Sequence, residues 1–287
     1  MAALALVAIA VLAAFQVRGL GGPRLIRMPL GALPDQTALT YDSAASTLSA
    51  VDDAGAAARA PVSLALSIAV DGTRVVVGTE NGVLLSEDGG RTLMPVLRDI
   101  HIWAVALSGA DAAAVSWGRS LYVSHDGGRG WRPASAPRAD LQINALLVTS
   151  SVWLAAAQIG VLVSHDQGES WVLAAGSPER ATSLLEDGGG LLLGTWNGDL
   201  YRSSERAASW QLVRAYPSGI WSLAAGGLVG TANGLFQAGR RVAGPLGQTE
   251  TVSVAVSGGT RFAATPGSRV WADAGDGWHQ VLAGVRW

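Results

Sequence analysis

Aspartate residues recur at regular intervals along this 287-residue chain and are the first candidates for chemistry. Asp88, Asp126 and Asp166 lie about 39 residues apart, Glu205 follows at a similar interval, and Asp273 stands in a similar segment near the C-terminus. Two carboxyl groups that cleave a glycosidic bond must lie about 5–9.5 Å apart. A period of this length puts each carboxyl group in a different structural repeat. We therefore expect them to be spread apart and predict no catalytic residue among them.

Histidine offers a second chemistry, because imidazole is a common general base and metal ligand. His125 and His165 occupy the same place in successive repeats, and His279 follows the last repeat. The same spacing separates these side chains, so the sequence predicts no metal site. It also contains no phosphate-binding loop and no dinucleotide fingerprint, so we expect no cofactor.

The repeating segment, called the box below, reads S-x-D-x-G-x-[ST]-W. Clear or recognisable copies lie at 86–93, 124–131, 164–171, 203–210 and 271–278, and decayed copies at 51–55 and 235–241. The residues expected to form the boxes are Ser86, Asp88, Gly90, Ser124, Asp126, Gly128, Trp131, Ser164, Asp166, Gly168, Trp171, Trp210, Asp273, Gly275 and Trp278. Ser and Asp side chains bond backbone N–H groups in tight turns, Gly supplies positive φ, and Trp adds buried area. This chemistry predicts a structural role for the box.

Short apolar stretches accompany each box and are separated by Gly-containing turns. In one repeat, two of these stretches precede the box, at 143–147 and 160–163, and one follows it, at 171–174. Other repeats show an additional stretch that ends near Gly-Thr, as in 191–195. Such a pattern indicates short β-strands. Four strands in a repeat of about 38 residues correspond to one propeller blade, with the box in the turn between the third and fourth strands.

The boxes resemble those of the bacterial neuraminidase repeat, or Asp-box, family of β-propellers. The resemblance covers roughly residues 37 to 287. The family includes sialidases, other glycoside hydrolases, sortilin-type receptors, the photosystem II assembly factor and bacterial envelope proteins. It implies a fold but no particular function.

Seven box positions predict an all-β fold, a single seven-bladed propeller of four-stranded antiparallel blades after one N-terminal hydrophobic helix. Six blades are the alternative, if the first box position only completes another blade. We expect a helix at 1–17, a linker at 18–36 and the propeller at 37–287. We also expect the N-terminal strands to pair with the last blade and so close the ring.

The first 17 residues include an apolar run with the length of a signal peptide or a short membrane anchor. They predict an extracytoplasmic protein that is either anchored or secreted. Arg18, Arg24 and Arg27 follow the run, and the positive-inside rule would place that side in the cytoplasm. The membrane orientation therefore stays open.

Composition excludes several other classes. Only 15% of the residues are charged and 49% are hydrophobic, which is unlike a disordered chain. A net charge of -2 gives no reason to expect nucleic-acid binding, and the absence of Cys excludes disulfides and thiolate metal sites.

Candidate binding residues lie on the face opposite the boxes, where the turns between second and third strands meet the connections between blades. They are Glu80, Trp103, Trp117, Arg119, Gln158, Trp196, Asn197 and Trp221. Exposed Trp and Arg are typical of binding hot spots. Trp103 and Trp221 stand at equivalent strand starts, so packing between blades is the alternative for these two.

We therefore expect a non-catalytic, membrane-tethered interaction or scaffold module that binds a protein partner, with a membrane complex as one option. The alternative is glycan binding or sialidase-like hydrolysis, for which an Arg-x-Pro at 27–29 resembles the Phe/Tyr-Arg-Ile-Pro motif of sialidases.

Overall fold

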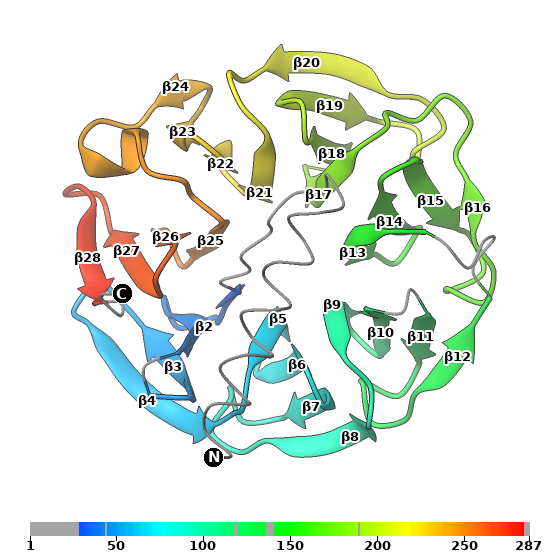
Figure 1. Cartoon of the computed structure of the whole chain (residues 1–287), viewed down its shortest axis with the longest axis horizontal. Coiled ribbons are helices and arrows are strands. Elements are labelled where there is room, and N and C mark those ends of the chain that lie inside the picture. The colour runs from blue at the N-terminus through cyan, green and yellow to red at the C-terminus, as the bar shows by residue number, and fades with distance from the viewer. Residues whose placement is uncertain (1–28, 44, 118–119, 136–140, 189, 284–287) are drawn as a thin grey trace, which may run out of the picture.

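Seven four-stranded antiparallel sheets surround a central axis in the computed structural model (Figure 1). The structure describes residues 29–43, 45–117, 120–135, 141–188 and 190–283. The seven-bladed propeller predicted from the sequence is confirmed, and the six-bladed alternative is wrong. The predicted N-terminal helix at 1–17 lies outside the described residues.

Each sheet consists of four consecutive strands, which are ordered from the axis outward. The innermost strands are β1 (Leu30–Ala32), β5 (Ala65–Asp71), β9 (Ile102–Ser108), β13 (Ile143–Val148), β17 (Ala181–Asp187), β21 (Ile220–Ala224) and β25 (Ser253–Ser257). The second strands are β2 (Ala38–Asp42), β6 (Arg74–Thr79), β10 (Asp111–Ser116), β14 (Trp153–Ala157), β18 (Gly190–Thr195), β22 (Leu228–Thr231) and β26 (Thr260–Thr265).

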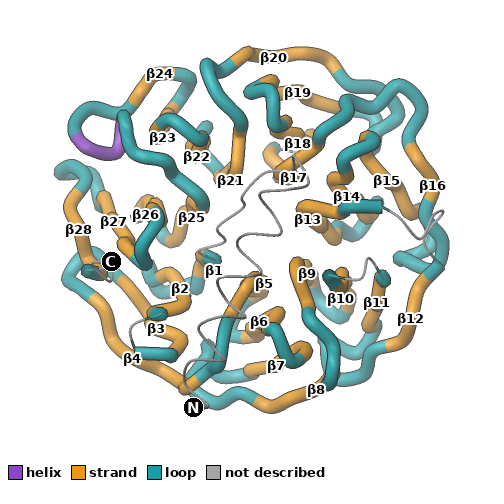
Figure 2. Tube along the Cα trace, in the orientation of Figure 1, coloured by secondary structure: helices purple, strands orange, loops and turns teal. Residues whose placement is uncertain are grey.

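The outer half of each blade holds the remaining two strands. The third strands are β3 (Thr47–Val51), β7 (Gly82–Ser86), β11 (Leu121–Ser124), β15 (Gly160–Ser164), β19 (Asp199–Ser203), β23 (Gly234–Gln237) and β27 (Arg269–Asp273). The outermost strands are β4 (Ala56–Pro61), β8 (Met94–Arg98), β12 (Arg132–Ala134), β16 (Val172–Leu173), β20 (Gln211–Ala215), β24 (Arg240–Arg241) and β28 (His279–Leu282). Figure 2 shows the one short 3₁₀ helix of the described chain, η1 (Pro245–Gly247), between blades 6 and 7.

Hydrophobic side chains fill the space between neighbouring blades rather than one central core. Seven clusters of buried residues occur in the described part of the chain, and each combines strands of at least two neighbouring blades. Between blades 4 and 5, for example, Leu154 and Val161 pack against Leu191 and Leu193. Both faces of most sheets are therefore buried, which explains why so few residues are charged.

Glycines on the second strands let the blades approach each other. A Cβ atom at Gly78 would lie 2.8 Å from Ile102 of the next blade, and one at Gly194 would lie 2.5 Å from Ile220. At Gly230 it would lie 2.7 Å from the backbone oxygen of Thr251. The glycine of the recurrent Gly-Thr pair is thus required because a side chain there would clash with the neighbouring blade.

The ring closes without strand exchange in the part of the chain that is described. β1 pairs with β2 in blade 1, and no strand of blade 1 pairs with blade 7. Instead, Ala38 and Val51 of blade 1 share a cluster with Phe262 and Val270 of blade 7, and the Ser257 hydroxyl donates to the Leu33 carbonyl. The expectation that N-terminal strands pair with the last blade was wrong, because blade 1 is already complete.

The propeller begins earlier than residue 37. β1 (Leu30–Ala32) lies inside the range 18–36 that we predicted as a linker. The strand has only three residues, and Gly31 at its centre leaves space for Ile68 and Val70 of blade 2. A strand this short, between two prolines, lacks the alternating pattern by which strands are recognised.

The outer edges are poorly suited to pairing with another chain. β16 and β24 have two residues each, and the pairing of β8, β20 and β28 with their inner neighbours is shifted by a bulge. Short and bulged edges are the usual protection against edge-to-edge association. We therefore place no binding site there, although Leu212 and Val213 of β20 are exposed.

Substitution of a box glycine should show how strongly the blades depend on close approach. Gly168 has a φ of 85°, and a Cβ atom there would lie 2.5 Å from Trp153 and 2.7 Å from Val123. We expect Gly168→Ala to lower the free energy of unfolding by about 2–5 kcal/mol, because left-handed backbone strain and overpacking add. Urea denaturation measures the change.

Gly176→Ala is the matched control for this prediction. Its φ is also positive, at 66°, but a Cβ atom there would meet nothing within 4 Å. It should cost only the backbone strain, about 1–2 kcal/mol. Equal losses in the two variants would contradict the packing explanation.

Candidate functional site

The box turns join the third and fourth strands of their blades and lie on one face, which we call the box face. In the box at 164–171, the Ser164 hydroxyl donates to Asp166 at 2.7 Å and accepts the Gly168 N–H at 2.8 Å. Asp166 also accepts the Ser170 N–H at 3.0 Å. The boxes at 86–93 and 124–131 repeat the Ser–Asp and Gly–Ser bonds at 2.8–3.0 Å. Each box turn is thus held by its own side chains.

Box tryptophans add a contact to the same turns. The indole N–H of Trp171 donates to the Gly168 carbonyl, and that of Trp131 donates to Gly128, both at 2.9 Å. A Cβ atom at Gly128 would lie 3.2 Å from Val76 of the preceding blade. The box therefore also presses its turn onto the neighbouring blade.

The box of blade 5 keeps only part of this pattern. Ser203 accepts the Ala207 N–H at 3.1 Å, and the Ser209 hydroxyl donates to Glu205 at 3.0 Å. Trp210 is partly buried against the cluster between blades 4 and 5, and its indole N–H has no hydrogen-bond partner among the described residues.

In blade 7, Asp273 does not occupy the box Asp position that we predicted. It ends β27 as Ser86 ends β7, and its carboxylate accepts the N–H groups two and four residues on, from Gly275 at 2.8 Å and Gly277 at 3.2 Å. These are the bonds that Ser86 makes to residues 88 and 90. Asp273 therefore replaces the serine of a shortened box, and Arg261 neutralises it at 2.6 Å. Trp278 packs partly buried against blades 6 and 7.

The two decayed copies are simple turns. In blade 1, Asp52 and not Asp53 accepts the backbone N–H groups of Ala54 and Gly55, at 2.8 and 2.9 Å. In blade 6, Ala238 and Gly239, both with positive φ, form a two-residue hairpin. Both copies lie between third and fourth strands, as the box positions predict.

The box carboxylates are suited to structure and not to proton transfer. Hydrogen bonds from Ser170 hold the pKa of Asp166 at about 2, and the Thr92 N–H does the same for Asp88. The Gly130 N–H lowers the pKa of Asp126. These groups are ionised at neutral pH, and each belongs to a different blade.

Acid unfolding should report these bonds. Carboxyl groups with depressed pKa stabilise the fold fully above about pH 4, and that contribution is lost as the pH falls through about 2. We expect Asp166→Asn to lower the free energy of unfolding at neutral pH by about 1 kcal/mol, because hydrogen bonds to a neutral amide are weaker than those to a carboxylate, and to flatten its decline between about pH 4 and 2. Parallel urea-denaturation profiles for wild type and variant would contradict this role.

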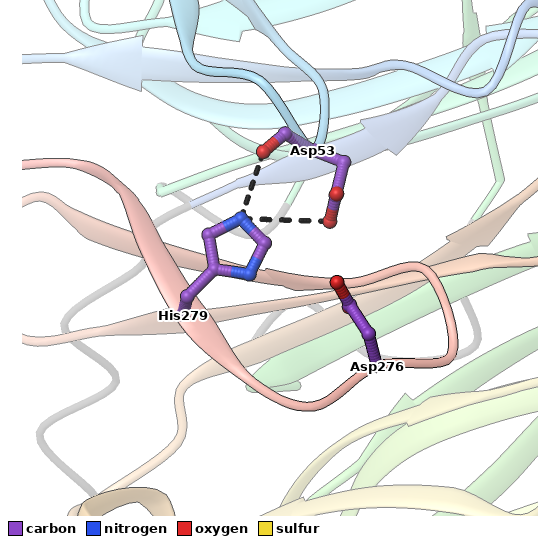
Figure 3. Close-up of side chains that lie close together, drawn as sticks. All are labelled: Asp53, Asp276 and His279. Carbon is purple, nitrogen blue, oxygen red and sulfur yellow. Dashed lines mark hydrogen bonds and ion pairs between the residues drawn. The ribbon is translucent and has the colours of Figure 1, made fainter.

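The seam between blades 7 and 1 carries the one possible metal-ligand cluster detected among the described residues (Figure 3). The His279 ring bonds the Asp53 backbone carbonyl at 2.7 Å and lies 3.5 Å from its carboxylate, and ligand atoms of Asp53, Asp276 and His279 fall within 4.8 Å of one another. All three side chains are exposed or partly exposed. Since the His279–Asp53 contacts join the two ends of the ring, we interpret the cluster as a seam contact.

A pH titration should detect this seam. The Asp53 carbonyl raises the pKa of His279. The resulting stabilisation is complete below the ordinary histidine pKa and is lost as the pH rises through the raised value. We expect the wild type to lose stability relative to His279→Gln between about pH 6 and 9, by less than about 1 kcal/mol, because the group is exposed. His165→Gln, an exposed box histidine, is the control, and an identical profile for all three proteins would contradict the seam bond.

The box-free face holds the turns between second and third strands and the connections between blades. In blades 2 to 6 the second residue of the innermost strand is bulged out of the β-ladder. These residues are Leu66, Trp103, Asn144, Thr182 and Trp221. Bulges re-aim side chains. Here Asn144 donates to Ala181 of the next blade at 2.7 Å, and Thr182 donates to Ile220 at 2.5 Å.

Trp117, in the turn that follows β10, places a large aromatic side chain on this face. It is 52% exposed. Its ring centroid lies 4.9 Å from that of Trp103, edge to face, and 5.5 Å from that of His101. The backbone N–H of Trp117 donates to the backbone carbonyl of His101 at 2.9 Å. The turn tip therefore presents a fixed indole, backed by a second indole that packs partly against blades 3 and 4.

Trp196 and Trp221 form a second aromatic pair, 4.8 Å between centroids. Trp221 is 8% exposed, and its indole N–H donates to Glu250 at 3.0 Å. Burial raises the pKa of Glu250. Trp221 therefore follows the packing alternative, whereas Trp196 in the turn of blade 5 is partly exposed.

The remaining predicted residues are polar. Glu80, Gln158 and Asn197 are exposed in the turns of blades 2, 4 and 5, and Arg180 donates to Asn197 at 3.2 Å. Arg119 lies outside the described residues. The structure brings Trp103 and Trp117 together and, separately, Trp196 and Trp221.

Sequence reasoning missed the threonines that hold these turns. Thr79 donates to the Gly82 carbonyl at 3.0 Å, Thr231 donates to Gly234 at 2.7 Å, and Thr195 donates to Asp199 at 3.2 Å. The recurrent Gly-Thr pair was the available signal. The Glu250 contact, by contrast, leaves no local pattern.

A shallow cavity of about 520 Å³ lies elsewhere, on the box face between blades 2 and 3. Its charged lining includes Arg74, Glu87, Asp126 and Arg129. Arg129 pairs with Glu87, and Arg74 donates to the Gly109 carbonyl. Because these groups already bond each other or the backbone, the cavity offers no obvious charged group for a ligand.

The sialidase alternative rests on an arginine at 27, which lies outside the described residues. None of the described residues forms a helix with the length and apolarity needed to cross a bilayer.

No protein-family model and no curated protein matches the chain. Solved propellers do match. YCF48 from Cyanidioschyzon merolae has a TM-score of 0.54 and 16% sequence identity, and the match covers 73% of this chain and 81% of that one. YCF48 bound to D1 peptide has a TM-score of 0.51 and 14% sequence identity, and the match covers 89% of this chain and 82% of that one.

Two further matches are larger proteins. The Niastella koreensis GH74 enzyme has a TM-score of 0.61 and 18% identity over 86% of this chain and 42% of that one. PorZ, a surface component of the type-IX secretion system of Porphyromonas gingivalis, has a TM-score of 0.55 and 15% sequence identity, and the match covers 87% of this chain and 38% of that one. At this identity the likeness shows the fold alone.

Proposed function

We propose that the protein is a non-catalytic interaction module of the Asp-box type that binds a protein partner through its box-free face. The observation that carries the proposal is the indole of Trp117, half-exposed yet fixed by His101 and Trp103. A rigid aromatic side chain buries a large area on binding at little entropic cost.

Three further observations support a binding role. The box carboxylates are committed to their own turns. The exposed polar residues in the turns of the same face, Glu80, Gln158 and Asn197, are of the kind that form a polar rim around an aromatic centre. A structural neighbour, YCF48, has been solved with a D1 peptide.

The proposal includes tethering on the outer side of a membrane by residues 1–17, as a subunit or assembly factor of a membrane complex. It is supported by the apolar N-terminal segment, and PorZ is a surface component with the same fold.

Partner capture with matched variants tests this function. The full chain is purified from detergent-solubilised membranes, and co-purifying polypeptides are quantified for wild type, Trp117→Ala and Leu212→Ala. Leu212 is exposed to a similar extent, 58% against 52% for Trp117, but lies on the outer strand β20. We expect Trp117→Ala to reduce capture about tenfold or more and Leu212→Ala to leave it unchanged.

Thermal unfolding of the three proteins provides the control, because both substitutions remove an exposed side chain and should leave the fold intact. Recovery of the monomer alone from wild type, or equal capture by all three proteins, would contradict the proposal. Retention on a glycan array that depends on Trp117 would instead support the glycan alternative.

A further inference from the structure

The described part of the chain begins at the box-free face of the propeller, where β1 starts. β1 is antiparallel to β2, with Leu30 opposite Thr40 and Ala32 opposite Ala38, so the chain passes from Leu30 toward the β1–β2 connection. That connection lies at the box face, because Leu33 and Gln36 contact Ser257 and Gly258 at the corresponding turn of blade 7. The Leu30 end of β1 therefore points to the box-free face, close to the axis (Figure 2).

The length of the preceding segment limits where the tether can lie. Residues 18–28 separate the predicted membrane segment from Pro29. Eleven residues span at most about 40 Å when fully extended, and about 20 Å on average as a flexible coil. The box face lies farther away by the length of the innermost strands, which is roughly 20 Å for the seven residues of β5. A tether of this length keeps the box-free face nearest to the membrane.

We infer that the box-free face is turned toward the membrane and that Trp117 and Glu80 there receive an arginine or lysine side chain from a surface segment of an integral membrane protein. The inference rests on the proposed tether and binding role and adds the orientation of the molecule and the chemistry of the partner.

The surroundings of Trp117 favour a cation. Glu80 is exposed in the neighbouring blade and forms no ion pair with any described residue, and Arg98 at the end of β8 does not pair with it. His101 contacts the Trp117 ring and is close enough to Glu80 for that charge to act on its pKa.

His101 does not neutralise the negative charge of Glu80. Burial lowers the pKa of His101, so the ring is neutral at pH 7. A guanidinium or ammonium group could therefore stack on the indole and pair with the carboxylate at the same time.

A lipid surface is a poorer occupant than a polypeptide. Binding to anionic lipids requires a cluster of Lys and Arg. The chain has no Lys, and the described residues around Trp117 carry Glu80 and Asp99 with the single basic residue Arg98, which is not a basic cluster. A membrane protein that presents a basic residue near the bilayer surface complements this charge.

Orientation can be measured with single cysteines, because the chain contains none of its own. Gln158→Cys places a bimane probe on the box-free face, and His165→Cys places one on the box face of the same blade. The full chain is reconstituted in vesicles that contain a headgroup-attached nitroxide lipid. We expect stronger quenching at position 158 than at 165. Equal or reversed quenching would overturn the orientation, whereas failure of the protein to float with the vesicles would refute the tether itself.

The partner chemistry is tested in native membranes. A benzophenone attached to the cysteine of Gln158→Cys is photoactivated, and the crosslinked product is analysed by gel and mass spectrometry. We expect a membrane polypeptide whose yield falls severalfold with Glu80→Gln and about tenfold or more with Glu80→Arg. Glu186→Arg, which reverses an exposed carboxylate near the box face, should have no effect.

Two outcomes would overturn the assigned chemistry. Crosslinking to lipid alone would indicate a membrane-docking face. A polypeptide whose yield depends on Trp117 but not on the charge at position 80 would support the proposed binding role while removing the basic side chain from it.

Discussion

Close contact between neighbouring blades is the constraint on which the rest of the molecule depends. The inner strand of each blade lies against the second strand of the preceding blade, and glycines at 78, 194 and 230 leave the space for it. Hydrophobic clusters then fill every interface around the ring. With apolar contacts on both sheet faces, a stable propeller forms from few charged residues, without disulfides.

Turns on the two faces are held by different side chains, and this difference decides where function can reside. On the box face, Ser and Asp side chains bond the turns of blades 2, 3 and 4, and these carboxylates are therefore not free for other chemistry. On the box-free face a single Thr or Ser bonds several of the turns, as Thr79 and Thr195 do, and the side chains at the tips are not needed for these bonds. Trp117, Gln158 and Asn197 occupy such tips. The box-free face, whose turns depend on fewer side-chain hydrogen bonds, is therefore the one available for recognition.

The period of the boxes was sufficient to predict seven blades and the strand that each box follows. It was insufficient for details that depend on contacts between distant segments. Asp273 takes the position of the box serine, but the box is two residues shorter between it and Trp278, so its distance to Trp278 matches that of a box Asp and alignment by sequence assigned it the wrong role. Closure by packing, the strand at Leu30–Ala32 and the bond from Trp221 to Glu250 leave no periodic signal. On the box-free face, turn position indicated Trp117 as exposed, but the strand starts did not distinguish the half-buried Trp103 from the buried Trp221.

Hydrogen–deuterium exchange on the full chain, in membranes and after purification, tests most directly that the box-free face binds the partner. In membranes, the account predicts protection of the turns around residues 79–82, 99–103 and 195–198, with unchanged exchange in the box turns at 86–93 and 164–171. Protection confined to the box turns, with the box-free face unchanged, would contradict it.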